Sequence, residues 1–429
     1  MVKVGAKLYR IETKLTRIRG RNYILLALLL AVMGLLSVAR FGATPEALPK
    51  IASVLVLVLA VGATILFWRI RLIFLLGGVA ILLAMNIVHV DALLDIMSLD
   101  VVFFIAMMMI VAEFVEAAGV FEWIAMKLLI VSRFRASLVY AFIMALGFVM
   151  AALVDEVTAI VILYGIILSV TRGLNVDPRP LLLSTVLAVN IGSAATLIGN
   201  PVGVLVAFKA GLTFNEFLLW ATPTAVACLI TQILIVLVLF RKEIEEFARA
   251  AKEKGPQLWV EFMEKSYHIK NEARFWEGFA VLLFVLGLIV VHHPLEEALH
   301  LPPKSIMLAA AFGGAALALY FEGDKAREIV ESGVCWWTLL FFACLFAAAE
   351  TLTITGAATD LAEDVIAITG GDHLALITLF TWVFGPLSGT IDNVPVVSIL
   401  VAIVKEIERE GINVCLLYTS DAADDGESV

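Results

Sequence analysis

Acidic side chains interrupt long apolar runs at two places in this sequence. Asp155 and Glu156 separate one pair of apolar runs, and Asp392 separates a second pair. A charged side chain at the centre of a bilayer costs about 2.5–3.5 kcal/mol on insertion scales. Desolvation raises the pKa of a carboxyl, so such a group can bind a proton or a cation in competition. The alternative is a solvated loop that happens to be acidic, but it does not explain why the pattern occurs twice.

The two acidic interruptions belong to an internal repeat with a spacing of 237 residues. The same spacing relates short phenylalanine runs, a glutamate, a glycine and the aspartate: Phe103–Ala106 with Leu340–Ala343, Glu113 with Glu350, Gly119 with Gly356, and Asp155 with Asp392. Five apolar crossings separate the copies, so the second copy is inverted, as in secondary transporters. Glu113 and Glu350 are candidates for a proton relay. The alternative places them at the interface, or protonated and hydrogen-bonded.

A second set of polar residues lies between Asn190 and Pro201, after a good apolar helix. Glycine and proline break a helix at membrane depth and free its carbonyls for a cation, while the next half-helix presents its positive end. Neutral oxygen ligands suit a hard cation such as sodium. The candidates here are Asn190, Gly192, Ser193, Thr196 and Asn200. Small residues also serve helix packing in membranes, and that alternative stays open.

Composition explains which elements must position these residues. Of the 429 residues, 62% are hydrophobic and 16% are charged, and the mean hydropathy is +1.01. A soluble domain needs about a quarter of its residues charged. We therefore predict an all-α polytopic membrane protein of about ten embedded segments, with re-entrant hairpins and broken helices. We expect no nucleic-acid partner, no cofactor and no metal beyond a transported sodium ion. The four cysteines are interpreted as small hydrophobes.

The distribution of charge predicts the organisation of the chain. A basic N-terminus with a cytoplasmic end precedes the first helices, and the polar stretch between Arg241 and Arg274 is interpreted as a cytoplasmic linker. Segment 136–172 is predicted to be one hairpin with Asp155 at its tip, although two full crossings remain an alternative. The predicted parts are a leading segment 1–68, a first repeat 69–240 with a broken helix 181–205, a linker 241–275, an incomplete second repeat 276–414 and a tail 415–429.

Several motifs together resemble the ion transporter superfamily. They are Val154–Thr158, Gly173–Arg179, Asn190–Pro201, Leu339–Ala343 and Ile391–Pro395. This superfamily includes arsenite permeases, NhaD-type sodium/proton antiporters, the melanosomal pink-eyed-dilution protein and sodium-coupled dicarboxylate and citrate transporters. The resemblance implies a homodimer in which hairpin tips and broken helices meet at a midplane site. It places Asp155, Glu156, Thr158, Asn190, Gly192, Ser193, Thr196, Asn200, Asp392 and Asn393 at that site.

The chain departs from the superfamily pattern at two positions. The usual Asp-Asn tip is Asp155-Glu156 here, and the usual Gly-Asp-Pro-Pro-Asn is Gly199–Gly203. One acid is gained and one is lost, which affects substrate identity more than fold. The end of the chain also departs, because Leu416–Asp424 resembles a translated sequencing adapter. We expect the second broken helix, which would start 237 residues after Asn190, to be absent.

The sequence thus favours a secondary active transporter in a prokaryotic plasma membrane. Within that class it favours sodium/proton-type antiport, because Asp155, Glu156 and Asp392 would repel a dianion unless bound cations neutralise them. The alternative is a permease for an anion or oxyanion such as arsenite, a dicarboxylate or citrate. An intramembrane hydrolase using the paired aspartates, or His292-His293 with a metal, is a remote alternative because neither Gly-x-Gly-Asp nor HExxH occurs. A non-transporting scaffold would not require broken helices.

Overall fold

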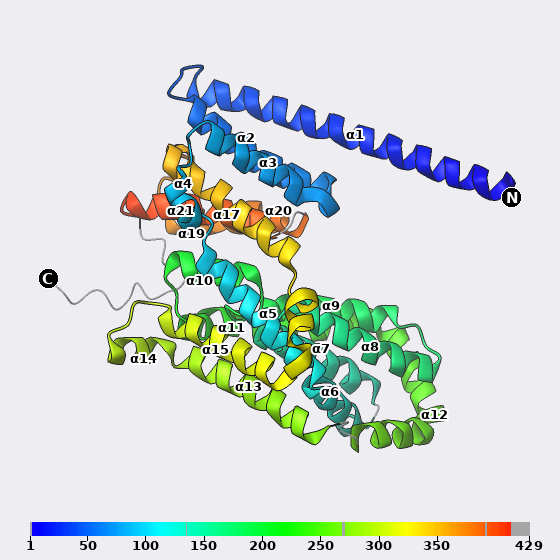
Figure 1. Cartoon of the computed structure of the whole chain (residues 1–429). Helices are drawn as coiled ribbons and strands as arrows, with labels where there is room; N and C mark the ends of the chain where they lie inside the picture. Colours follow the sequence, from blue (N-terminus) through cyan, green and yellow to red (C-terminus); the bar gives the residue numbers. More distant parts are fainter. Residues whose placement is uncertain (1, 134, 268–270, 391–392, 413–429) are drawn as a thin grey trace. The chain divides into compact units, whose positions relative to one another are not determined.

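The computed structural model describes residues 2–133, 135–267, 271–390 and 393–412. Throughout these ranges the regular structure is helical, without a strand, and the helices are drawn in Figure 1. Helices satisfy every backbone donor and acceptor within one segment, which is the requirement that a hydrocarbon environment imposes. The predicted all-α class is therefore confirmed.

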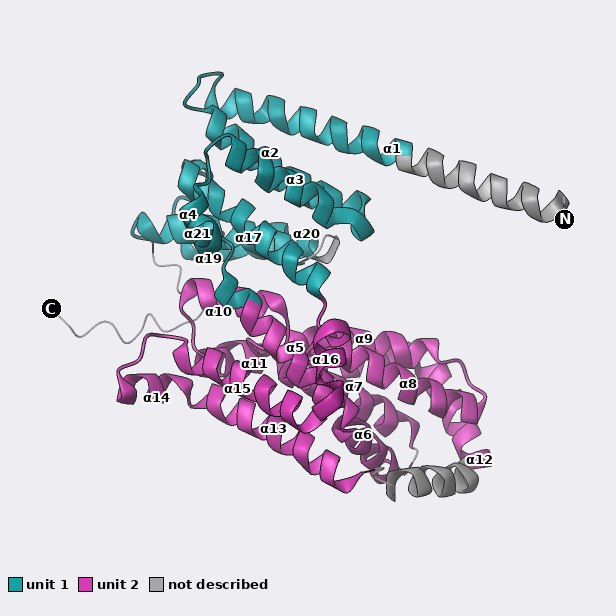
Figure 2. Cartoon of the chain, viewed as in Figure 1, with its two compact units in different colours: residues 1–102, 336–429 teal, residues 103–335 magenta. Residues whose placement is uncertain are grey.

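The chain divides into two compact units, coloured teal and magenta in Figure 2. Unit 1 consists of Met1–Val102 and Trp336–Val429, and unit 2 of Phe103–Cys335. Unit 1 holds helices from both ends of the chain: α1 (Val2–Phe41), α2 (Leu48–Leu66), η1 (Trp68–Ile70), α3 (Arg71–Ala84), α4 (Val90–Ile96), α17 (Trp336–Thr355), α18 (Ala357–Thr369), α19 (His373–Leu379), the π-helical η4 (Phe380–Phe384), α20 (Gly385–Thr390) and α21 (Asn393–Arg409).

Unit 2 contains the middle of the chain, after the first residues of α5. Its elements are α5 (Leu99–Ala117), α6 (Val120–Val131), α7 (Ala136–Leu153), α8 (Glu156–Leu174), α9 (Arg179–Ser193), α10 (Pro201–Ala210), α11 (Phe214–Leu239), α12 (Arg241–Tyr267), α13 (Glu272–Val290), α14 (His292–Leu299), α15 (Ser305–Glu322), η2 (Gly323–Lys325), α16 (Ala326–Glu328) and the π-helical η3 (Ile329–Gly333). The polar stretch that the sequence predicts as a linker is thus largely the helix α12.

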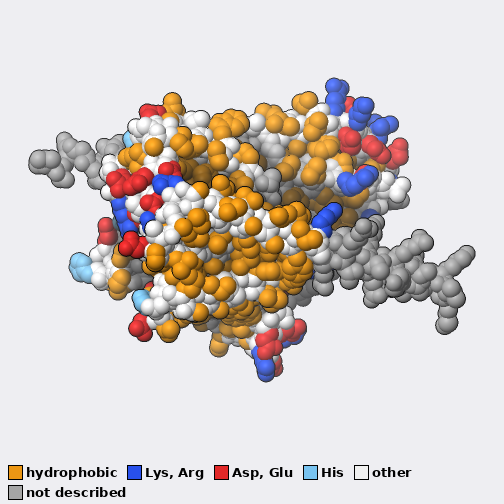
Figure 3. Space-filling view, turned by 90° about the horizontal axis from the view of Figure 1, so that it is seen from above, with side chains coloured by type: hydrophobic (Ala, Val, Ile, Leu, Met, Phe, Trp, Pro, Cys, Tyr) orange, Lys and Arg blue, Asp and Glu red, His pale blue; other side chains and the backbone are white. Residues whose placement is uncertain are grey.

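Eight helices of the described ranges are long and apolar enough to cross a membrane, and there are up to ten if two bent helix pairs are each counted as one span. This number agrees with the prediction of about ten embedded segments. Hydrophobic side chains cover much of the face drawn in Figure 3, and charged side chains gather toward its margins. Such a surface is stable where lipid, rather than water, solvates the apolar side chains.

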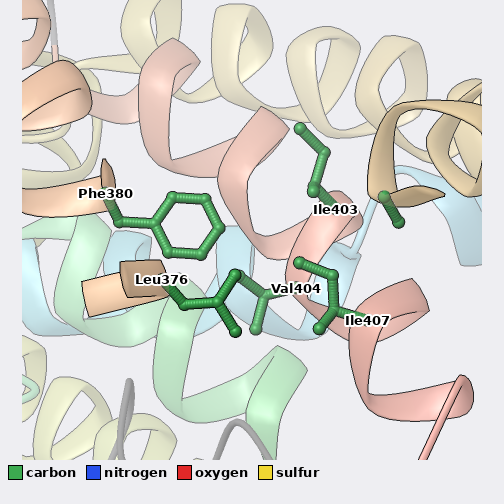
Figure 4. Close-up of a cluster of buried hydrophobic side chains, with 6 residues drawn as sticks. Leu376, Phe380, Ile403, Val404 and Ile407 are labelled. Atoms are coloured by element: carbon green, nitrogen blue, oxygen red, sulfur yellow. The ribbon is translucent and has the colours of Figure 1, made fainter. Parts of the chain in front are cut away.

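Unit 1 is held together by apolar packing and by ion pairs. Leu376 and Phe380 pack against Ile403, Val404 and Ile407, so the segment before the second acidic interruption is joined to α21 (Figure 4). Two ion pairs tie α18 to the first helices: Arg40 donates to Asp364 at 2.9 and 3.0 Å, and Lys50 pairs with Asp360.

Unit 2 is organised around the close contact of α7 with α9. A Cβ atom at Gly192 of α9 would lie 2.3 Å from the carbonyl oxygen of Phe148, and one at Gly147 of α7 would lie 2.9 Å from Val189. Only glycine permits two helix backbones to approach so closely, as is common in membranes. Helices α8 and α11 also pack on α9, and α12 packs on α6, α7 and α8.

The 237-residue spacing recurs in the helix boundaries. Shifting α5, α6, α7 and α8 by this spacing places their first residues at the starts of α17, α18, α19 and α21. The glycines that precede α6 and α18 also match, because Gly119 has a φ of 74° and Gly356 a φ of 77°. The two copies thus share a succession of local structures. Inversion of the second copy stays a prediction.

Candidate functional site

The first half of the candidate site is the break between α7 and α8. Helix α7 ends at Leu153 and α8 begins at Glu156, so Asp155 lies between them with an extended backbone. Its Oδ1 atom accepts hydrogen bonds from the backbone N–H groups of Val157, at 2.7 Å, and Thr158, at 2.9 Å. Asp155 is therefore the N-cap of α8, and its negative charge faces the positive end of that helix.

The length of these helices leaves the membrane path of the hairpin open. Helices α7 and α8 contain 18 and 19 residues, and both are apolar enough for a full crossing. Asp155, Glu156 and Thr158 are all half-buried at the break. The re-entrant path that would put them at mid-membrane stays a prediction.

The second half of the candidate site is the break between α9 and α10. Helix α9 ends at Ser193 and α10 begins at Pro201. Asn200 joins the two half-helices: its Oδ1 accepts from the Gly203 N–H at 2.7 Å, and its Nδ2 donates to the carbonyl oxygen and Oγ of Ser193 at 3.1 and 3.2 Å. The Ser193 hydroxyl in turn donates to the carbonyl oxygen of Asn190 at 3.0 Å. Proline at the first helical position and an Asn cap explain why α10 restarts there.

The two breaks lie against each other within unit 2. Thr196, between α9 and α10, is buried and donates its hydroxyl hydrogen to the carbonyl oxygen of Ala152 in the last turn of α7. A Cβ atom at Gly199 would lie 2.8 Å from the carbonyl oxygen of Ala151. The structure thus brings the Asp155 break together with Thr196 and the rest of the interval from Gly192 to Asn200.

This arrangement gathers helix ends of both polarities. The carbonyl ends of α7 and α9 carry partial negative charge, and the N–H ends of α8 and α10 carry partial positive charge. Carbonyl oxygens, hydroxyl oxygens and the Asp155 carboxylate are ligands for a hard cation. The N-terminus of α10 can instead attract an anion. The candidate site therefore offers possible ligands for a charge of either sign.

The candidate residues of the second copy belong to unit 1. Asp392 lies outside the described residues. Asn393 begins α21, is exposed, and accepts a hydrogen bond from the Ser388 hydroxyl at 2.8 Å. Glu350 is half-buried on α17. A joint site made by both copies therefore stays a prediction.

Glu113 of the proposed proton relay lies on α5, where its side chain packs against Gly333. Glu116 lies one turn further along the same helix. Glu116 also lines a cavity of about 340 Å³ together with Glu122 and residues of α8. Sequence reasoning did not include Glu116 and Glu122 among the site residues. The available signal was that both are acids in an apolar stretch. Their position beside α8 depends on packing between segments far apart in the sequence, which local patterns do not predict.

Sequence reasoning also missed two polar side chains of α11. Thr222 donates to the carbonyl oxygen of Ala195 at 2.7 Å, and Gln232 donates to that of Ser184 at 2.8 Å. The two hydrogen bonds thus join α11 to α9 and to the segment that follows it. The available signal was a polar residue inside an otherwise apolar helix, which needs a partner in a membrane. In the described ranges no group of three or more His, Cys, Asp or Glu side chains could hold a metal ion.

Comparison with known proteins identifies the family. The model of the citrate transporter family (CitMHS) matches residues 55–419. An uncharacterized transporter of Mycobacterium tuberculosis is 34% identical over 311 residues, which cover 72% of this chain and 68% of that protein. An uncharacterized transporter of Synechocystis is 25% identical over 307 residues, covering 71% and 64%. The P protein of Mus musculus is 25% identical over 445 residues, covering 86% and 52%.

These matches agree with the resemblance that the sequence motifs carry, and they indicate a transporter rather than an enzyme. A membrane transporter resides in lipid, which explains both the apolar helices and the hydrophobic composition of the chain. The chain belongs to the citrate transporter family and is an integral, multi-pass membrane transporter.

Proposed function

We propose that this protein is a secondary active transporter that carries a small carboxylate anion together with a coupling cation, sodium or a proton. The observation that supports this most is the meeting of the Asp155 break with the Asn190–Pro201 break inside unit 2. Membership of the citrate transporter family favours a carboxylate as the carried anion. Family membership thus moves the preference away from the sodium/proton antiport that the sequence alone favours.

The proposed binding mode assigns each charge to one kind of helix end. The cation binds at the carbonyl ends of α7 and α9, beside the carboxylate of Asp155. The carboxylate anion binds at the N–H end of α10, next to Asn200. The cation offsets the repulsion between the anion and Asp155, so each ligand raises the affinity of the other. This coupling is the feature that makes transport ion-dependent.

Cation/proton antiport is the second candidate function. It is favoured by Glu116 and Glu122, which line one cavity with residues of α8, and by the acid at position 156, where the superfamily usually has Asn. Acidic side chains near one another share protons, and a cation that binds among them displaces a proton. In this candidate no organic anion is carried.

Uptake into proteoliposomes separates the two candidates. Radiolabelled citrate is offered with an inward sodium gradient, with an inward proton gradient, or with neither. The proposal predicts saturable citrate uptake that requires one of the gradients. Antiport predicts no citrate uptake; instead, sodium that enters along its inward gradient exchanges for protons that leave, and a pH-sensitive dye reports alkalinisation of the lumen. Native mass spectrometry of the same preparation tests the homodimer that the family resemblance implies.

A further inference from the structure

The end of α10 that lies away from the candidate site is held by a lysine from a distant loop. Lys304, directly before α15, donates a hydrogen bond from its Nζ to the carbonyl oxygen of Phe208 in the last turn of α10. The same Nζ lies 5.0 Å from the centroid of the Phe208 ring. That ring is itself packed 5.6 Å from the ring of Phe104 on α5. One side chain thus contacts both the backbone and the side chain of Phe208.

The loop that carries Lys304 is fixed by a buried carboxylate. Glu296 of α14 is only 6% exposed, and it accepts hydrogen bonds from the N–H of Lys304 at 3.0 Å and from the N–H of Ile306 at 2.8 Å. Lys304 has a φ of 71°, a left-handed backbone that is costly for a residue with a Cβ atom. Glycine would fit this backbone better, so a side chain kept here at that cost indicates a role for the side chain.

The contact between Lys304 and Phe208 is expected to stabilise the C-terminal end of α10. The last carbonyls of a helix have no partner within the helix, and a cation beside them also interacts favourably with the helix dipole. Helix α10 has only 10 residues, which is too short to be stable without external contacts. Its other end is Asn200, which joins α10 to α9. A rigid short helix transmits the position of one end to the other.

We propose that Lys304 is a positioning residue that clamps the C-terminal end of α10 and thereby sets the geometry, and the ion affinity, of the break at Asn200. Glu296 holds the loop from which Lys304 reaches α10. The part concerning ion affinity rests on the proposed function, whereas the clamp itself does not. Release of this clamp loosens α10 while α9, which packs on α7, keeps its structure.

Hydrogen–deuterium exchange of the intact protein tests the clamp without reference to transport. In Lys304→Met, which keeps the aliphatic stem and loses the ammonium, amides of residues 202–211 are expected to exchange about fivefold faster, with α9 unchanged. Lys304→Arg should restore slow exchange. The matched control is Lys127→Met, because Lys127 also lies over an aromatic ring, that of Trp123 at 5.4 Å. Unchanged exchange of α10 in Lys304→Met would overturn the proposal.

A second variant separates positioning from simple stabilisation. Lys304→Gly relieves the left-handed backbone strain but removes the ammonium, so the thermal stability should hold while the half-saturating sodium concentration rises about fivefold. In Lys304→Arg, which keeps the positive charge, the half-saturating sodium concentration should equal the wild-type value. An unchanged sodium dependence in Lys304→Gly would overturn the positioning role. If citrate uptake by the wild-type protein depends on neither a sodium nor a proton gradient, the proposed function fails instead, and the exchange result alone decides the clamp.

Discussion

The two copies of the hairpin differ most in their first limb. In the first copy this limb is α7, an uninterrupted helix of 18 residues. In the second copy it is divided into α19, the π-helical η4 and α20. The repeat places Phe148-Val149 of α7 opposite Gly385-Pro386. Proline lacks an N–H and clashes with the carbonyl four residues earlier, and a π turn is a usual way to accommodate it. The sequence difference therefore explains the structural one.

The two limbs also differ in what covers them. Helix α9 covers α7, with Gly192 in contact with the backbone of Phe148. In the second copy Leu374 and Trp382 are 72% and 75% exposed, and none of the described residues covers the limb as α9 covers α7. We therefore expect the geometry of the first break to depend on its cover, α9.

Disrupting the α7–α9 contact should have the largest effect. Gly192→Val forces new carbon atoms into the backbone of Phe148, which cannot move aside, so we expect a loss of about 3 kcal/mol or more. Thermal unfolding in detergent measures this. The control is Gly287→Ala on α13, where nothing lies within 4 Å of the added Cβ and stability should hold or rise slightly. Equal stability of the two variants would contradict the role assigned to the cover.

Exchanging the limb residues between the copies should have the next largest effect. Val149 is 47% exposed, so Val149→Pro creates no core clash but breaks the helix at a cost of about 3 kcal/mol. The reverse change, Pro386→Val, should alter stability by less than about 1 kcal/mol and slow amide exchange through residues 380–390. Thermal unfolding and hydrogen exchange measure both. A harmless Val149→Pro would show that the first limb does not need to be regular.

Removing the hydroxyl that links the two breaks should have a smaller effect. Thr196→Val leaves the carbonyl oxygen of Ala152 without its hydrogen bond, at a cost of about 1–2 kcal/mol. The matched control is Thr231→Val, whose hydroxyl donates to Ala227 of its own helix on an exposed face and should change stability by under about 0.5 kcal/mol. If both variants unfold at the same temperature, the link between hairpin and broken helix contributes nothing.

The smallest effect is expected in the loop that joins the first hairpin to its cover. Hydrogen bonds from Arg179 lower the pKa of Asp177. A lowered pKa means that the pair stabilises the folded protein at neutral pH and ceases to do so as the pH falls through that pKa. The wild type should therefore unfold at a slightly higher temperature than Asp177→Asn at pH 7. The difference should vanish well below about pH 4, the ordinary carboxyl range; a difference that persists there would contradict the assignment.

Local signals allowed much of the first copy to be predicted from sequence. Glycine, proline and asparagine mark the break after α9 because they govern backbone conformation locally, and α9 ends at Ser193 within the interval singled out. The π-helical segment had such a signal in Gly385-Pro386. The contacts of Thr222 and Lys304 could not be predicted, because they join residues 27 and 96 positions apart. Such pairings follow from tertiary packing, which periodicity does not encode.

Sodium binding by two aspartate variants tests whether the first break is the ion site. Asp155→Asn keeps the oxygen that caps α8 and removes only the charge, and Asp372→Asn does the same at the start of α19, where Asp372 accepts from the Ala375 N–H at 2.9 Å. Scintillation-proximity binding of radiolabelled sodium should weaken at least about tenfold in Asp155→Asn and stay within about twofold in Asp372→Asn. Equal sodium affinity of Asp155→Asn and the wild type would contradict the assignment of the first break as the ion site.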